Sequence, residues 1–131
     1  MDVGLLVPHA PPMLLLDKLV EKRKGFSRTT SLIAGERLIG DCAEFYIELV
    51  AQTMAAAQEY EALEDGKPVR DGMLVGIDSF SFYELNPIPG KILEIEAALE
   101  MEFGPVKIIQ GKVMFNDLVY AEGKIKVWEN D

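Results

Sequence analysis

The sequence predicts an α+β domain in which a curved antiparallel sheet wraps around one buried helix. Three observations support this prediction. Phe45–Leu63 is apolar around most of a helical circumference, which is typical of a helix covered on several sides. The segments after it read as strands, and one alternates between apolar and acidic side chains. Two further strands are expected before the helix, so strands and helices do not alternate as in a parallel α/β fold.

The 131-residue chain suits a single domain over residues 1–131. Its 49% hydrophobic and 27% charged residues are typical of a globular protein. The net charge of −9 argues against nucleic-acid binding, because phosphates require a basic surface. No stretch has the length and apolarity of a membrane span, and the N-terminus does not resemble a signal peptide. Since the one cysteine allows no internal disulfide, we expect a cytoplasmic protein.

The segment before the helix is expected to hold an ordered turn and two strands. Tandem prolines in Pro8–Pro12 remove backbone donors and keep the chain extended, so this segment should be a non-helical elbow. Met13–Val20 and the Thr-rich Phe26–Ile33 are expected strands, with a turn at Lys22–Gly25 between them.

The predicted helix is rich in Ala and contains neither Gly nor Pro, and Gly66 suits a left-handed cap after it. Its polar residues Glu48, Gln52 and Glu59 fall on one narrow stripe. This stripe is either a solvated face of the helix or the polar part of a functional site.

Four strands are predicted after the helix: Gly72–Tyr83, Lys91–Phe103, Val106–Phe115 and Leu118–Trp128, with Asn116-Asp117 as a hairpin turn. In the second of these, Ala97, Leu99 and Met101 alternate with glutamates, so we expect one face of the sheet to contact water. A domain of this size with such an apolar helix commonly completes its core by forming a homodimer or a higher homo-oligomer.

Three regions, in the same order along the chain, resemble the FabZ-type β-hydroxyacyl-acyl carrier protein dehydratases. Pro8–Asp17 (PHAPPMLLLD) is similar to that family's PHRxPxLLxD opening, and Ile47–Gln52 (IELVAQ) to its EAMAQ helix. Val75–Asp78 (VGID) and Pro87–Gly90 (PIPG) resemble its GID and PxxPG motifs. The opening and the helix also resemble the divergent ApeP-like branch of aryl-polyene gene clusters.

The resemblance implies a hotdog-fold homodimer that dehydrates 3-hydroxyacyl thioesters to trans-2-enoyl thioesters, a hydro-lyase reaction of fatty-acid or polyene-type biosynthesis. We expect no cofactor, and one His and one Cys exclude a His/Cys metal site, although not a site made of carboxylates alone. In that family a helix carboxylate and a histidine flank the thioester in a tunnel between the subunits. Glu48 matches the carboxylate, while Gln52 and Gly76 lie in the matching motifs as expected substrate-binding residues.

The sequence departs from the family where the catalytic histidine should be. The family has an HFPG motif shortly before the helix, but residues 34–42 (AGERLIGDC) contain no histidine. The one imidazole in the chain belongs to His9, so our hypothesis is that His9 and Glu48 are the catalytic pair. Two alternatives stay open: a hotdog thioesterase whose carboxylate activates water, and a non-catalytic acyl-binding or pairing subunit.

The expected partner is an acyl group carried by acyl carrier protein or by coenzyme A. Acyl carrier proteins are acidic, so docking on this acidic chain would use the basic stretch Lys18–Arg28, or Lys67 and Arg70. The plainer interpretation of Lys22–Lys24 is a solvated turn.

Overall fold

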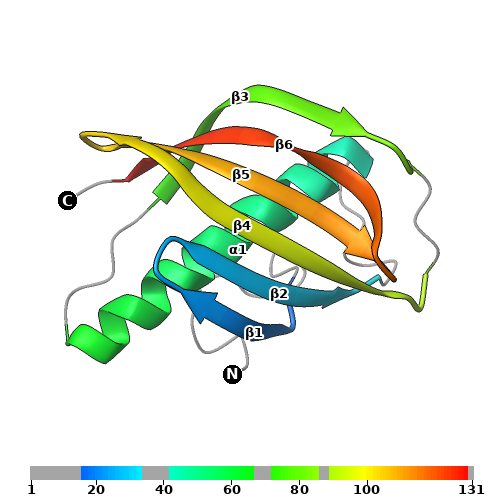
Figure 1. Cartoon of the computed structure of the whole chain (residues 1–131), viewed down its shortest axis with the longest axis horizontal. Helices are drawn as coiled ribbons and strands as arrows, with labels where there is room; N and C mark the ends of the chain where they lie inside the picture. Colours follow the sequence, from blue (N-terminus) through cyan, green and yellow to red (C-terminus); the bar gives the residue numbers. More distant parts are fainter. Residues whose placement is uncertain (1–15, 34–41, 67–71, 86–88, 130–131) are drawn as a thin grey trace.

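The computed structural model describes residues 16–33, 42–66, 72–85 and 89–129. Within them, helix α1 (Cys42–Asp65) lies behind a six-stranded antiparallel sheet (Figure 1). The strands are β1 (Lys18–Arg23), β2 (Phe26–Leu32), β3 (Gly72–Phe82), β4 (Ile92–Phe103), β5 (Val106–Phe115) and β6 (Leu118–Glu129). The order β1-β2-β4-β5-β6-β3 makes β1 and β3 the two edges. The predicted class, a sheet wrapped around one helix, is confirmed.

The boundaries agree closely with the sequence except at the first strand. The helix is slightly longer at both ends than Phe45–Leu63. The strand predicted at Met13–Val20 is instead β1, which continues to Arg23, while residues 13–15 lie outside the described ranges. The expected hairpin turn is confirmed, because Asn116 and Asp117 both have positive φ (48° and 66°), as a tight two-residue hairpin requires. No helix in the described ranges is long and apolar enough to cross a membrane.

The core lies between α1 and the concave face of the sheet. Alternate residues of the central strands point inward and are fully buried, as a strand with one covered face requires. This inner layer consists of Leu93, Ile95 and Ala97 on β4, Ile109 and Val113 on β5, and Ala121 and Ile125 on β6. The helix contributes fully buried Tyr46, Leu49 and Val50.

Strand β2 presents hydroxyl groups to the helix in place of large apolar side chains. The Oγ1 atoms of Thr29 and Thr53 lie 2.8 Å apart, and the Thr53 hydroxyl donates to the carbonyl of Leu49 at 2.8 Å. Thr29 is therefore the donor to Thr53. Ser27 adds a 3.4 Å hydrogen bond to the Thr53 carbonyl. These buried hydroxyls hold α1 against β2 without leaving their own polar groups unsatisfied.

Gly111 on β5 is the point where the helix meets the sheet most tightly. A Cβ atom at this position would clash with the side chain of Val50. We expect Gly111→Ala to lower the free energy of unfolding by about 1–3 kcal/mol through overpacking, measured by urea denaturation. Val50→Ala in the same chain should recover part of the loss by removing the clashing methyl groups. Equal losses in the single and double variants would contradict this explanation.

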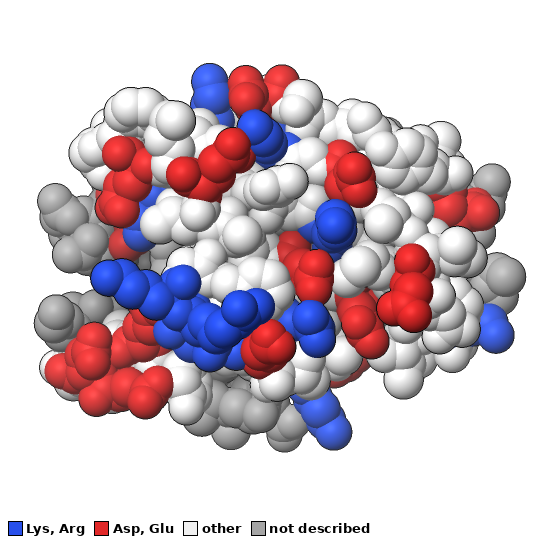
Figure 2. Space-filling view, viewed as in Figure 1, with Lys and Arg blue, Asp and Glu red and all other residues white. Residues whose placement is uncertain are grey.

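The outer face of the sheet carries a row of alternating charges across five strands. Glu21, Arg28, Glu96, Lys112 and Glu122 are successive cross-strand partners from β1 to β6. Nη2 of Arg28 lies 2.9 Å from a carboxylate oxygen of Glu96, and this hydrogen bond raises the pKa of Arg28. Figure 2 shows acidic and basic groups interspersed over this face, with basic atoms gathered in a band over the β1–β2 end. The prediction of a solvated sheet face is confirmed.

A β-bulge in β4 reverses the alternation that the sequence suggested. The register against β5 shifts between Leu99 and Met101. Met101, expected on the apolar side, instead pairs with Ile108 and is 49% exposed, so its predicted placement is wrong. An extra residue in a strand moves every later side chain to the other face. Lys107 lies under the sheet for a different reason, because it shares the inward parity of buried Ile109 and Val113 on β5.

Candidate functional site

Glu48 and Gln52 lie on the side of α1 that is turned away from the sheet. Successive helix residues point about 100° apart, so these two side chains point nearly opposite to Val50 and Thr53, which contact the sheet. Gln52 is nevertheless 1% exposed, Glu59 is buried and Glu48 is half-buried. The interpretation of this stripe as a solvated face is therefore wrong. Contact with water does not explain why polar side chains occupy this face of the helix, because they are buried there.

The two side chains are joined directly. Nε2 of Gln52 donates to Oε1 of Glu48 at 3.2 Å, one helical turn apart. In the described part of the chain, none of the hydrogen bonds or ion pairs uses the second carboxylate oxygen, Oε2. The carboxylate thus has one anchored oxygen and one oxygen available to a substrate.

Aromatic contacts fix the start of α1 against the end of β3. The rings of Tyr46 and Phe82 are stacked, with centroids 6.4 Å apart and planes at 18°. The Tyr46 hydroxyl donates to the carbonyl oxygen of Glu84 at 2.7 Å, and Phe80 packs on Phe82 with centroids 5.3 Å apart. Because Glu48 follows Tyr46 by two residues, these contacts also fix where its carboxylate lies relative to β3.

Gly76 lies on the same edge strand but far from these contacts. It is half-buried beside a register shift in β3, opposite Lys126. Phe82 follows Gly76 by six positions, about 20 Å of extended chain, and β3 and α1 diverge from their meeting point (Figure 1). One chain therefore does not bring Gly76 and Glu48 together. His9 lies outside the described residues, as do Lys67 and Arg70.

The basic stretch is largely engaged in contacts within the chain. Nζ of Lys22 lies 2.5 Å from the Glu61 carboxylate, and Arg28 is bound to Glu96. The Arg23 guanidinium lies 4.4 Å from the centroid of the Phe26 ring. These contacts leave fewer cations for a partner than the sequence suggests.

The position of the stretch also separates it from the candidate site. The Lys22–Glu61 pair places the β1–β2 hairpin beside the C-terminal half of α1. Glu61 follows Glu48 by thirteen residues, which is about 20 Å along a helix. The hairpin and Glu48 are therefore at different ends of α1.

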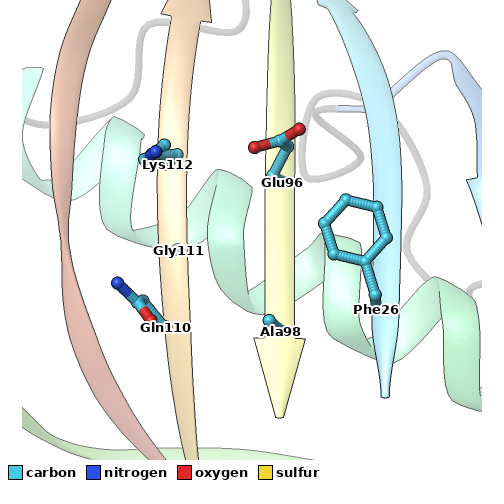
Figure 3. A pocket seen from close by; sticks show the side chains of 6 residues that line it. All are labelled: Phe26, Glu96, Ala98, Gln110, Gly111 and Lys112. Atoms are coloured by element: carbon cyan, nitrogen blue, oxygen red, sulfur yellow. The ribbon is translucent and has the colours of Figure 1, made fainter. Parts of the chain in front are cut away.

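Two hollows of the surface lie apart from Glu48. Figure 3 shows the first, about 170 Å³, on the outer face of the sheet and lined by Phe26, Glu96, Ala98, Gln110, Gly111 and Lys112. The sheet stands between this hollow and α1. The second, about 350 Å³, lies between β1 and the last turns of α1, where Leu19, Val20, Glu21, Lys22, Tyr60 and Glu64 line it. Neither hollow includes a residue of the predicted site.

A buried carboxylate that the sequence reasoning missed lies under the other end of the sheet. Glu129 is 6% exposed, and one oxygen of its carboxylate accepts from Nζ of Lys107 at 2.5 Å and from Nε2 of Gln58 at 2.8 Å. The inward parity of β6 could have revealed Glu129, since it follows buried Val127 by two residues. Among the described residues, no three His, Cys, Asp or Glu side chains could together hold a metal ion.

A family model and a protein of known family both match this chain, and both describe dehydratases. The model of a family described as ApeP-like, ApeP dehydratase, matches residues 1–131. A 3-hydroxyacyl-[acyl-carrier-protein] dehydratase FabZ of Ruminiclostridium cellulolyticum is 30% identical over 135 residues, which cover 95% of this chain and 92% of that protein.

Solved structures agree on the fold. The dehydratase heterocomplex ApeI:P from Xenorhabdus doucetiae contains a chain that matches with a TM-score of 0.88 at 18% identity, covering 100% of this chain and 92% of that chain. A hypothetical thioesterase with coenzyme A from Streptococcus pneumoniae TIGR4 matches with a TM-score of 0.65 at 10% identity, over 86% and 84% of the two chains. The hotdog fold expected from the sequence motifs is confirmed.

Proposed function

Because the chain belongs to the ApeP-like family of dehydratases, we propose that it removes water from a 3-hydroxyacyl thioester and that Glu48 takes part directly. In this reaction a proton leaves the carbon next to the thioester carbonyl, the 3-hydroxyl departs as water after protonation, and a trans double bond forms. One group must accept the first proton, and the same or another group must supply the second. We assign these transfers to Glu48 and His9.

The half-buried carboxylate of Glu48 is the observation that carries the proposal. It has one oxygen held by Gln52 and one oxygen available, on a helix face that is enclosed although it does not face the sheet. Proton transfer requires a catalytic group that is held in place within hydrogen-bonding reach of the reacting atoms. The hydrogen bond from Gln52 holds the carboxylate of Glu48 in place.

The second part of the proposal is that two hotdog chains pair along β3, as the expected homodimer requires. Gly76 and Glu48 are apart within one chain, so a site that uses both must draw them from two chains. The two sheet edges differ in the way that pairing requires. Four of the six residues of β1 are charged, which protects that edge, whereas β3 carries one charged residue, Asp78, and exposes Val75 and Ile77, which are 51% and 52% accessible.

Ile77→Lys should break this pairing, because it places an unpaired charge in the apolar contact. The control is Val20→Lys on the β1 edge, where the residue replaced is equally exposed at 53%. Native mass spectrometry over a concentration series should show the dimer of the unchanged protein, a monomer for Ile77→Lys and a dimer for Val20→Lys. A dimer that survives Ile77→Lys would contradict pairing through β3. One similar structure is a heterocomplex. If the unchanged protein is a monomer, the partner expected on the β3 edge is a different hotdog chain.

The proposal also includes the carrier of the acyl group and the cellular location of the protein. The relative from Ruminiclostridium cellulolyticum is a dehydratase of substrates on acyl carrier protein, which favours that carrier over coenzyme A. The acidic chain leaves only local basic residues to meet an acidic carrier, so docking should weaken as salt screens it. The single cysteine suits the reducing cytoplasm.

To test the proposal, the purified protein is incubated with the same 3-hydroxyacyl group carried either by acyl carrier protein or by coenzyme A. Mass spectrometry should show the loss of one water from the acyl carrier protein substrate. Release of free thiol without loss of water would identify a thioesterase instead. Binding of either thioester without any turnover would identify a non-catalytic acyl-binding subunit and overturn the proposal.

A further inference from the structure

Helix α1 carries two glutamines that donate to carboxylates. Gln52 donates to Glu48 at 3.2 Å, and Gln58 donates to Glu129 at 2.8 Å. The second pair holds two elements together, since Glu129 belongs to β6 and also binds Lys107. The first pair joins residues one turn apart on the same helix, so this hydrogen bond ties no second element to α1.

The burial of Gln52 argues against a direct contact with the substrate. A side chain that lines an open channel keeps some accessible surface, and Gln52 is 1% exposed while Glu48 beside it is half-buried. A thioester reaching this face of the helix would therefore meet Glu48 and would not meet the amide behind it.

We infer that Gln52 is a positioning residue, whose buried amide holds Oε1 of Glu48 so that Oε2 faces the substrate. The inference rests on the proposed function and deepens it, because it replaces the expected contact between Gln52 and the thioester with an action through Glu48. A hydrogen bond from a fixed donor removes rotational freedom from the carboxylate before the substrate arrives. Catalytic groups held in the productive geometry avoid that cost during the reaction.

Gln52→Met tests the inference because methionine has nearly the same shape and helix propensity but no donor. We expect kcat for dehydration to fall by about 10- to 100-fold, the range for loss of a hydrogen bond to a charged group, with KM changed by less than about twofold. Gln58→Met is the matched control, since it removes the same kind of donor from Glu129 on the same helix. It should lower the melting temperature and leave kcat unchanged.

A double-variant comparison separates action through Glu48 from other roles. If Gln52 acts through Glu48, adding Gln52→Met to Glu48→Gln should reduce the remaining rate no further. Where that rate is too low to measure, the two Glu48→Gln proteins should bind the enoyl thioester product with the same affinity. Circular dichroism should first establish that each variant is folded. If Gln52→Met does not fold, Gln52→Asn shortens the side chain by one methylene and gives the same readout.

Three outcomes would overturn the inference: an unchanged kcat in Gln52→Met, a raised KM with kcat preserved, or an additional loss in the Glu48→Gln background. The raised KM would instead indicate direct contact with the thioester. Full activity of Glu48→Gln would refute the mechanism under the proposed function. An inactive Glu48→Gln together with a fully active Gln52→Met would refute this inference alone.

Discussion

Glu48→Gln should reduce the rate of dehydration by about 10²- to 10⁴-fold, the usual contribution of a positioned acid or base. The change keeps the shape of the side chain and its ability to accept from Gln52, but removes the ability to take up a proton at neutral pH. Because the amide remains in the same half-buried place, the fold should persist. The loss of water from a 3-hydroxyacyl thioester, followed by mass spectrometry, measures the effect.

Glu61→Gln is the control for this prediction. It makes the same chemical change on the same helix, thirteen residues farther along, where Glu61 pairs with Lys22 at the surface. We expect the activity of this variant to match the unchanged protein. Dehydration by Glu48→Gln at the original rate would mean that the helix carboxylate takes no part in the reaction.

Lys107→Met should destabilise the protein by about 3–5 kcal/mol, because it removes a cation that binds the buried carboxylate of Glu129. The Lys107 side chain is 14% exposed and that of Glu129 is 6% exposed, so water cannot replace the lost partner well. Small domains have a free energy of unfolding of about 5–15 kcal/mol, so this loss should be visible as a large fall in the urea midpoint.

The same substitution at Lys124 provides the contrast. Lys124 and Glu100 also form an ion pair, at 2.8 Å, but both side chains are 37% exposed. Exposed pairs contribute little to stability because water screens them, so Lys124→Met should move the midpoint only slightly. Replacing Glu129 by Gln in the Lys107→Met chain should recover part of the stability, because a neutral amide is less costly to bury. Equal effects at Lys107 and Lys124 would show that burial does not decide the strength of these pairs.

Most of the fold follows from the periodicity of the sequence. The nearly all-apolar helix predicted a buried element, and the strand patterns predicted the sheet that covers it. The turn at Asn116-Asp117 and the cap at Gly66 followed from residues that accept a left-handed backbone, and both have the expected positive φ. Local backbone preferences act over a few residues, so a single sequence reveals them.

The candidate site followed from the sequence only in part. The family motifs predicted Glu48 and Gln52 together, and the structure places them in hydrogen-bonding contact. The sequence could not tell a solvated stripe from a buried one, since the pattern of the helix is the same in both cases. Their burial depends on what lies against the far side of α1. The catalytic roles of His9 and Glu48 and the substrate-binding roles of Gln52 and Gly76 stay predictions.

The sequence by itself determined that one apolar helix lies within an antiparallel sheet, because side-chain periodicity shows which face of each element is apolar and must be buried. Only the tertiary structure decided which strand edges are open, where β4 bulges, and that Lys107 meets Glu129 beneath the sheet. One extra residue in a strand turns every later side chain to the other face, and contacts between residues far apart in the chain decide where that happens. The sequence pattern predicts which face of each element is buried, and the packing of the helix against the sheet determines which residues meet on that face.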